Sequence, residues 1–333
     1  MITKIIDTSD IESAAKCLKN GGTVVFPTET VYGLGADAFN PDAIEKIYIA
    51  KGRPSDNPLI VHISDISDVS FLARSITPNA KILMEIFWPG PLTLIFKKKD
   101  NVPDKVTAGL DTVAVRYPSN ETARKLIKQS GVLVAAPSAN LSGSPSPTIC
   151  EDVVSDLNGR VDYIIDGTGC EIGLESTVVD VSGDETVILR PGGITLEMIK
   201  EYIPNAKLDG GLIDEKTIPK CPGLKYKHYS PKAELIVVQG ERENVRKYIS
   251  SKLNKSRKAG VLSYGEAEYE NAELIINAGN NMEEYAHNLF SALRTFDKKG
   301  ITLIYAEFNI EDGMGVAVRN RLYKAANHNI IEV

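Results

Sequence analysis

The chain of 333 residues lacks the patterns that mark several common protein classes. Its four cysteines include no C-x-x-C pair, so neither a zinc ribbon nor a disulfide framework is expected. The four histidines include no pair at metal-ligand spacing, so no metal site is expected either. No apolar run approaches the roughly 18 residues that span a bilayer. The N-terminal segment meets acidic residues before any long apolar run, which is unlike a signal peptide. The sequence therefore predicts a soluble, cytoplasmic protein.

The common nucleotide-binding and hydrolase signatures are also missing. There is no G-x-x-x-x-G-K-[ST] segment, which excludes a P-loop, and there is no G-x-S-x-G nucleophile elbow. Gly313-Met314-Gly315 supplies only two of the three glycines of a dinucleotide fingerprint, and it comes late in its domain. We interpret it as a glycine-rich turn before a helix.

An excess of positive charge is absent, because 44 acidic and 38 basic residues give a formal net charge of −6. A nonspecific polyanion binder usually has a basic surface, so the sequence argues against one, although a local pocket for a small anion is compatible with it. The hydrophobic fraction of 43% is enough to form a core and makes global disorder improbable. The length predicts about two domains.

Short apolar strands alternate with helices along the chain, which predicts an α/β protein with a largely buried sheet. A capping box at Ser9-x-x-Glu12 opens the first predicted helix, and Asn40-Pro41 opens the second. The first seven expected strands lie near 23–27, 59–63, 92–96, 112–116, 132–136, 163–165 and 177–181, and an eighth lies near 187–190. Further along, strands are expected at ELIVV, GVLSY, ELIINA and ITLIYAE, with helices near 241–254, 281–297 and 315–326.

The character of the chain changes after residue 206. Residues 207–232 have three prolines and no usable periodicity, and their six lysines and three acidic residues give this segment a net charge of +3. A structureless stretch this long is either a linker or a functional loop. We therefore predict an α/β domain over 1–206, a linker or active-site lid over 207–232, and a smaller α/β domain over 233–333.

Polar and cationic residues follow several of the predicted strands in the first domain. The segments after these strands are PTETVYG (27–33), RYP (116–118), PSANLSG (137–143) and RPGG (190–193). Loops at strand ends commonly present ligand-binding side chains in α/β sheets. Each segment alone has the composition of an ordinary turn, but four together predict a polar, cationic pocket.

Two further segments carry chemistry that suits an anionic ligand. Lys51 and Arg53 lie two residues apart in KGRPSDNPL, where they can hold one anion from two sides or, more simply, complement a helix C-terminus. His62 lies within an apolar strand, where a histidine is more often a core residue than a ligand. In the linker, Tyr229 follows Lys227 and His228, and such an aromatic and basic loop can close over an adenine and its phosphates.

Taken together, these segments resemble the threonylcarbamoyl-AMP synthase family in its long form, which has a YrdC-like catalytic domain, a linker and a C-terminal domain. The resemblance rests on PTETVYGLG (27–35), KGRPSDNPL with His62, WPGPLT (88–93), TVAVR (112–116), APSANLSG (136–143), LESTVVD (174–180) and LRPGG (189–193). It continues more weakly in GLKYKHYSP (223–231) and GMGVAVRNRLYKAA (313–326). The fold it implies is a YrdC-like twisted mixed open sheet with helices, followed by a smaller Rossmann-like α/β domain.

The resemblance also implies an activity. Family members are nucleotidyltransferases that form threonylcarbamoyl-AMP and pyrophosphate from L-threonine, bicarbonate and ATP. The product is passed to a tRNA-modifying threonylcarbamoyltransferase that makes threonylcarbamoyladenosine in tRNA. Mg²⁺ is expected to arrive with ATP, held by phosphate oxygens and water rather than by protein ligands. No organic cofactor, membrane association or tight direct tRNA binding is expected.

The same resemblance assigns the site residues, with Lys51 and Arg53 in the catalytic role. L-threonine would be bound by Thr30, His62, Arg116, Ala136, Ser138 and Ser176. ATP would be bound by Lys51, Arg53, Asn57, Thr112, Asn140, Ser146, Arg190 and Tyr229.

Two other functions are compatible with such a fold. A YrdC-like domain can present a basic concave face to RNA, but residues 1–206 carry 27 acidic against 19 basic residues, which disfavours an RNA-binding module. The other alternative is an enzyme that forms a carbamoyl-adenylate, as the YrdC-like domains of hydrogenase-maturation proteins do. Those proteins carry additional zinc-finger cysteines that this sequence lacks.

Overall fold

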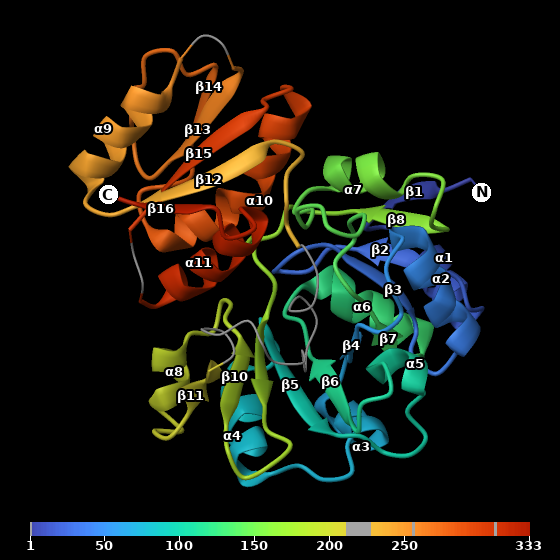
Figure 1. The fold of residues 1–333 in the computed structure, drawn as a ribbon. Coiled ribbons are helices and arrows are strands. Elements are labelled where there is room, and N and C mark those ends of the chain that lie inside the picture. Colours follow the sequence, from blue (N-terminus) through green and yellow to red (C-terminus); the bar gives the residue numbers. More distant parts are fainter. Residues whose placement is uncertain (1, 211–227, 255–256, 310–311) are drawn as a thin grey trace. The chain divides into compact units, whose positions relative to one another are not determined.

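The computed structural model describes residues 2–210, 228–254, 257–309 and 312–333, and it divides the chain into two compact units (Figure 1). The first unit consists of residues 1–142, 147–171 and 175–225. The second consists of residues 143–146, 172–174 and 226–333. Two short segments from within the predicted first domain (1–206) therefore belong to the second unit, which the predicted division at 206 and 232 did not anticipate. Most of the predicted linker, residues 211–227, lies outside the described residues.

The first unit is built on a mixed sheet, which within the described ranges has 11 strands. Their order across the sheet is β1 (Lys4–Asp7), β8 (Tyr163–Asp166), β2 (Val24–Phe26), β3 (Gly33–Asp37), β7 (Val134–Ala135), β4 (Ile60–His62), β6 (Thr112–Arg116), β5 (Leu92–Lys97), β9 (Thr177–Asp180), β10 (Val187–Arg190) and β11 (Lys207–Leu208). The eight strands predicted for this region are all present. The sequence analysis missed β1, β3 and β11. β3 has the sequence GLGAD, whose glycines are depleted in strands and concealed it.

Helices cover both faces of this sheet. They are α1 (Ile11–Lys19), α2 (Pro41–Lys51), a 3₁₀ turn (Ile66–Asp68), α3 (Val69–Leu72), α4 (Pro78–Phe87), α5 (Asp104–Thr107), α6 (Glu121–Ser130), α7 (Cys150–Leu157) and α8 (Leu196–Lys200). α1 and α6 pack together in one core cluster, which includes Leu18 and Leu126. A larger cluster contains α2, α4 and the middle strands, including Ile44, Leu83 and Val115. Because both faces are covered, the strands have continuous apolar sequences.

Local sequence accounts for the start of α2 but not for the start of α1. The Oδ1 atom of Asn40 accepts hydrogen bonds from the amides of Asp42 and Ala43, both at 3.1 Å, as predicted for this N-cap. The capping box predicted at Ser9 and Glu12 is wrong, because α1 begins after Asp10 and no side chain caps it. The apolar face of α1, which is buried against the sheet, is what fixes that helix.

The second unit has a parallel sheet with the strand order β14 (Leu274–Asn277), β13 (Ala259–Ser263), β15 (Leu303–Phe308), β12 (Glu234–Gln239) and β16 (Ile330–Glu332). Its helices are α9 (Arg242–Lys252), α10 (Met282–Lys298) and α11 (Met314–Ala325). α9 packs on the sheet through a cluster that includes Val245, Ile249 and Val261, while α10 and α11 contact each other. Every element predicted for this region is present, and only β16 was missed. The Rossmann-like expectation is confirmed, and Gly313 precedes α11 as predicted.

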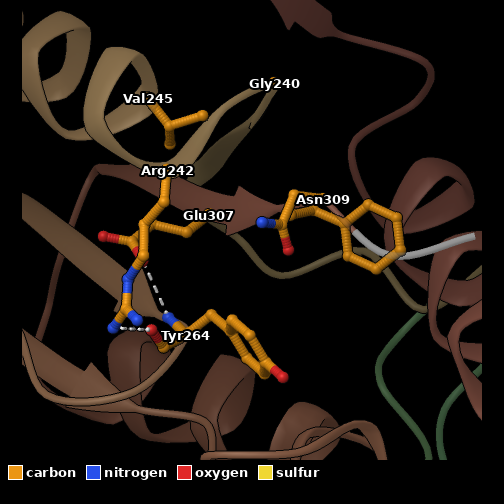
Figure 2. Close-up of a pocket in the computed structure, with 7 residues that line it drawn as sticks. Gly240, Arg242, Val245, Tyr264, Glu307 and Asn309 are labelled. Atoms are coloured by element: carbon orange, nitrogen blue, oxygen red, sulfur yellow. Dashed lines mark hydrogen bonds between the residues drawn. The ribbon is translucent and has the colours of Figure 1, made fainter.

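A small pocket lies at the carboxyl ends of β12, β13 and β15 (Figure 2). Its polar groups bind one another. The Tyr264 amide donates to Glu307 Oε2 at 3.0 Å, and Arg242 donates to the Tyr264 carbonyl oxygen at 3.0 Å. Arg246 and the Tyr269 hydroxyl complete the hydrogen bonds of the Glu307 carboxylate. This network fixes the loop that follows β13.

Candidate active site

Several predicted site residues lie side by side where neighbouring strands of the first unit end. His62 on β4 is the register partner of Arg116 on β6, and Arg116 is in turn the partner of Thr93 on β5. Residues directly opposite each other on adjacent strands project from the same face of a sheet. The sheet thus brings together side chains that are 23 to 54 positions apart in the sequence, which local patterning alone did not establish.

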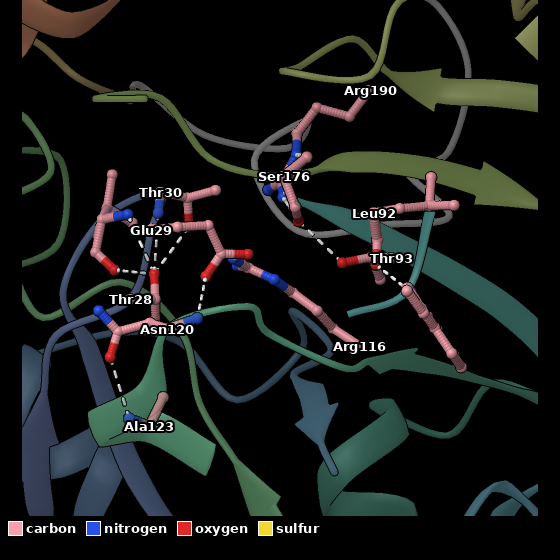
Figure 3. Close-up of polar contacts among 12 residues, drawn as sticks. Thr28, Glu29, Thr30, Leu92, Thr93, Arg116, Asn120, Ala123, Ser176 and Arg190 are labelled. Carbon is pink, nitrogen blue, oxygen red and sulfur yellow. Dashed lines mark hydrogen bonds and ion pairs between the residues drawn. The ribbon is translucent and has the colours of Figure 1, made fainter. Parts of the chain in front are cut away.

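Arg116 forms a buried ion pair with Glu29, with 2.7 Å between its Nη2 atom and Glu29 Oε1 (Figure 3). Both side chains are about 95% or more buried. Burial alone would raise the pKa of Glu29, but the Arg116 charge and hydrogen bonds outweigh it and hold the pKa below its usual range. The Asn120 amide also donates to Glu29 Oε2, at 3.4 Å. Arg116 therefore sits in a prepared position with a carboxylate beside it.

His62 is buried as a neutral imidazole. Burial, together with the nearby Arg116 charge, lowers the pKa of His62 to about 3. Its Nδ1 atom lies 3.2 Å from the Ile60 carbonyl oxygen, and its ring meets Phe26 edge to face at 6.1 Å. These contacts fix the ring orientation next to Arg116.

The turn between β2 and β3 buries the Thr30 side chain completely. The Thr28 hydroxyl donates to the Val31 carbonyl oxygen at 2.6 Å and lies 2.9 Å from the Thr30 hydroxyl. Since the single hydroxyl proton of Thr28 is already used, the Thr30 hydroxyl is the donor of the second bond. Hydrogen bonds among the residues that flank Glu29 thus fix the turn that carries it.

Ser176 and Arg190 form a second buried group. The Arg190 Nη2 atom donates to the Ser176 carbonyl oxygen at 2.9 Å and to its Oγ atom at 3.1 Å, and Nε donates to the same carbonyl oxygen at 3.1 Å. Ser176 Oγ lies 2.8 Å from the Thr93 hydroxyl (Figure 3). A residue predicted for threonine and one predicted for ATP are therefore in direct contact.

Lys51 and the segment that follows β7 form the third group. The buried Lys51 Nζ atom donates to the carbonyl oxygens of Ser138, at 2.5 Å, and Asn140, at 2.7 Å. It also donates to Asn140 Oδ1 at 3.3 Å, and the Ser138 hydroxyl donates to that same Oδ1 atom. A cation at the end of α2 thus organises the Ser138–Asn140 backbone.

Four further predicted residues of this unit are Arg53, Asn57, Thr112 and Ala136. Arg53 donates to the carbonyl oxygens of Asn57 and Pro58, at 3.4 and 3.3 Å. The Asn57 Nδ2 atom is buried, and no described residue accepts a hydrogen bond from it. Thr112 opens β6, at the opposite end of that strand from Arg116. The Ala136 amide already donates to the Ile60 carbonyl oxygen at 2.9 Å.

Ser146 and Tyr229 belong to the second unit. Ser146 is completely buried there. The Tyr229 ring stacks on Phe290, with 5.2 Å between centroids, and the Arg321 guanidinium lies 5.8 Å from its centroid. The backbone of Tyr229 has a positive φ of 64°. The Tyr229 ring is thus held by contacts within that unit.

The sequence analysis did not assign a role to Glu29 or Thr93, although both lie within the quoted motifs PTETVYGLG and WPGPLT. Glu29 could have been singled out because it is the one acidic residue in PTETVYGLG, a strand-end segment in which the other side chains are hydroxyl-bearing or apolar. Thr93 has no such signal, because a threonine is ordinary in a strand. Only the register with Arg116 reveals its position.

Within the described ranges, no group of three or more histidine, cysteine, aspartate and glutamate residues is arranged to hold a metal ion. No helix there is long and apolar enough to cross a membrane. The donors gathered in the first unit are cations, hydroxyls and amides, which suit the oxygens of an anionic substrate.

The fold and this group of residues define a class of two-unit α/β protein whose first unit is YrdC-like. A family model described as "Telomere recombination", for the Sua5, YciO and YrdC proteins, matches residues 16–192. A second model, the C-terminal domain of threonylcarbamoyl-AMP synthase, matches residues 194–327. The chain belongs to the threonylcarbamoyl-AMP synthase family.

Relatives of the full length support this membership. A threonylcarbamoyl-AMP synthase from Pyrococcus abyssi is 46% identical, over 98% of this chain and 97% of its own. One from Bacillus subtilis is 47% identical, over 99% and 97%. A crystal structure of P. abyssi Sua5 with L-threonine has a TM-score of 0.94 and 45% identity, and the match covers 100% of both chains. The predicted family, fold class and synthase activity are confirmed.

Proposed function

We propose that the residues described above in the first unit bind L-threonine and ATP for the synthase reaction. The observation that carries this proposal is the buried row of His62, Arg116 and Thr93, which continues through Ser176 to Arg190. Arg116 would hold the threonine carboxylate, because a guanidinium matches a carboxylate with two parallel hydrogen bonds. Thr30, His62, Ser138 and Ser176 would complete the threonine site, with the Ala136 backbone beside them.

ATP would be bound by the second set of residues. Lys51 and Arg53 supply positive charge for its phosphates, and Arg190 adds a third cation. Asn57 has a buried amide available to a ligand, and Thr112, Asn140 and Ser146 add hydroxyl and amide groups. Tyr229 would contribute an aromatic ring. These assignments follow the family pattern, and the burial of Lys51, Asn57 and Arg190 supports them.

The chemistry we propose begins with the threonine amine and bicarbonate, which give an N-carboxylate. This carboxylate attacks the α-phosphorus of ATP, and pyrophosphate leaves. Phosphoryl chemistry of this kind depends on alignment and charge neutralisation rather than on a protein nucleophile. A site of lysine, arginine, hydroxyl and amide groups is therefore sufficient, with Lys51 and Arg53 in the catalytic role.

Mg²⁺ would enter with ATP and supply further charge neutralisation on the phosphates. The described residues include no group of three or more histidine, cysteine, aspartate and glutamate residues that could hold a metal ion, and Glu29 is already paired with Arg116. This donor set fits a metal that keeps phosphate and water ligands. We further propose that the product passes to a tRNA-modifying threonylcarbamoyltransferase in the cytoplasm.

The test is release of pyrophosphate by the full-length chain with ATP, L-threonine and bicarbonate. We expect release only when all three substrates are present, with threonylcarbamoyl-AMP found by mass spectrometry. Omission of threonine or of bicarbonate, one at a time, is the matched control. Release that is unchanged without threonine contradicts the proposal.

Two further measurements distinguish the synthase from the two alternative functions. Carbamoyl phosphate in place of threonine and bicarbonate tests for a carbamoyl-adenylate enzyme. Tight tRNA binding without pyrophosphate release would favour an RNA-binding module.

A further inference from the structure

Formation of the N-carboxylate requires a proton acceptor. Threonine enters as an ammonium ion, and only its neutral amine can attack the carbon of bicarbonate. Among the side chains proposed to surround threonine, Arg116 has a guanidinium group that only donates hydrogen bonds, and the hydroxyls of Thr30 and Ser176 are already hydrogen-bonded. Glu29 is engaged with Arg116 and has a lowered pKa. His62 is the remaining candidate.

We propose that the Nε2 atom of His62 accepts the proton lost by the threonine ammonium, so that His62 is the general base of N-carboxylation. This inference rests on the proposed function. The proton moves from the ammonium to Nε2, and the free amine forms a C–N bond to bicarbonate. The C–O bond to the bicarbonate hydroxyl breaks at the same carbon, and this hydroxyl takes the second proton of the amine nitrogen and leaves as water. The products are the N-carboxylate, water and a protonated His62, which later releases its proton to solvent.

The first support is the tautomer that the surroundings of His62 impose. Its Nδ1 atom lies 3.2 Å from the Ile60 carbonyl oxygen, and a carbonyl oxygen only accepts hydrogen bonds. This contact favours the tautomer that carries the hydrogen on Nδ1; a second backbone hydrogen bond, to Val134, also acts on the ring. In a neutral ring the Nε2 atom then has no proton and presents a lone pair. The Phe26 edge contact at 6.1 Å holds this ring orientation.

The second support is the position of His62 beside Arg116. The two residues are register partners on adjacent parallel strands, which lie about 5 Å apart. An amino acid whose carboxylate is held by Arg116 carries its amine only two bonds from the carboxylate carbon. The amine is therefore brought to the neighbourhood of His62 by the same contact that binds the substrate.

The third support is electrostatic. The charged groups that act on His62 are Arg116 on β6 and Glu29 in the turn after β2. Without substrate, burial and Arg116 keep the pKa of His62 low, so the ring stays neutral and ready to accept a proton. A substrate carboxylate on Arg116 adds negative charge and raises that pKa towards the working pH, which a general base requires.

The decisive variant is His62→Asn, because an asparagine amide can keep the hydrogen bond to the Ile60 carbonyl oxygen but has nothing in place of Nε2. We expect kcat to fall by about 100-fold or more, with the threonine Kd changed by less than about 3-fold. Below the amine pKa, the rate of the variant should rise about tenfold per pH unit, because it depends on free amine, while wild type is flatter. The matched control is His328→Asn, an exposed histidine of the second unit, which should behave as wild type.

A full kcat with a wild-type pH profile in His62→Asn would overturn the proposal. So would a loss seen only in threonine affinity. If wild type itself forms no threonylcarbamoyl-AMP, the proposed function fails first, which distinguishes the two failures.

A second measurement does not depend on any variant folding. NMR of wild-type protein with ¹⁵N-labelled histidine should show a buried ring protonated at Nδ1 and unprotonated at Nε2. A buried ring protonated at Nε2 instead would contradict the proposal, since that atom then has no lone pair to accept a proton.

Discussion

Glu29 in the first unit and Glu307 in the second are both 3% exposed, and each has an arginine as neighbour. Glu307 accepts hydrogen bonds from the Tyr264 amide, the Tyr269 hydroxyl and Arg246, whose side chain is 30% exposed. Glu29 faces a buried Arg116, whose Nε atom has no hydrogen-bond partner among the described residues. The carboxylate of the second unit completes a network within the protein, whereas the pair in the first unit retains donors for a ligand.

The hydrogen bonds of a buried charged side chain indicate whether its role is structural or functional. A fully hydrogen-bonded buried carboxylate positions a loop, and its donors have no further capacity. A buried arginine with an unused donor is costly unless something binds there. The comparison therefore favours catalysis in the first unit and a structural role for the Glu307 network.

The largest expected effect is on stability. Glu29→Ala leaves Arg116 as a buried charge without its partner, and we expect the first unit to lose about 3–5 kcal/mol. Glu307→Ala should cost the second unit about 1–3 kcal/mol, since Arg246 can reach water. The chain has a single tryptophan, Trp88, which lies in the first unit, so its fluorescence follows that unit in urea. A Trp88 transition that moves equally for both variants would remove the distinction.

The next effect is on catalysis. Lys51→Ala removes a buried cation that holds two backbone carbonyl oxygens, and we expect pyrophosphate release to fall by about 100- to 1000-fold. Arg242→Ala, in the pocket of the second unit, should keep the rate within about twofold, because Arg242 donates to the Tyr264 carbonyl oxygen in the loop after β13 and has no assigned role in the reaction. Circular dichroism establishes that both variants are folded. Near-normal turnover of Lys51→Ala would contradict the catalytic role.

A smaller effect is expected on substrate affinity. Arg116→Lys keeps the charge but loses the planar fork, so the KM for threonine should rise by about 10- to 100-fold. Arg246→Lys is the matched change beside Glu307 and should leave that KM unaltered. Initial rates at saturating ATP measure both. An unchanged KM in Arg116→Lys would separate Arg116 from the threonine carboxylate.

The most gradual effect, spread over several pH units, is on the pH dependence of stability. The pKa of His62 is lowered to about 3 in the folded chain from an ordinary value near 6.5, so the unfolded state binds more protons between these values. Folding is therefore weakened as the pH falls through this window, by up to about 1.4 kcal/mol per pH unit. His62→Asn should lose this contribution, while His328→Asn should keep it. The Trp88 transition in urea at several pH values measures the slope.

Most of the secondary structure was predictable, because apolar periodicity and caps such as Asn40 are local signals. The strands that the sequence analysis did not predict were missed for physical reasons. The strand β3 is made of glycines and small residues, and β1 and β16 lie at sheet edges or chain ends, where the patterns are short. The site residues were found through motif resemblance rather than periodicity, and Glu29 was missed because its partner is 87 positions away.

The sequence by itself determined the α/β class, the family and the residue types of the site, since these depend on local pattern and on motifs. It also set the cationic character of Lys51, Arg116 and Arg190 within an acidic half of the chain. Only the tertiary structure decided which of these residues meet. The register of β4, β6 and β5 places His62, Arg116 and Thr93 in one row, and the turn after β2 brings Glu29 to Arg116. The hydrophobic pattern of a strand helps to set its register, but which distant strand it pairs with depends on the packing of the whole fold.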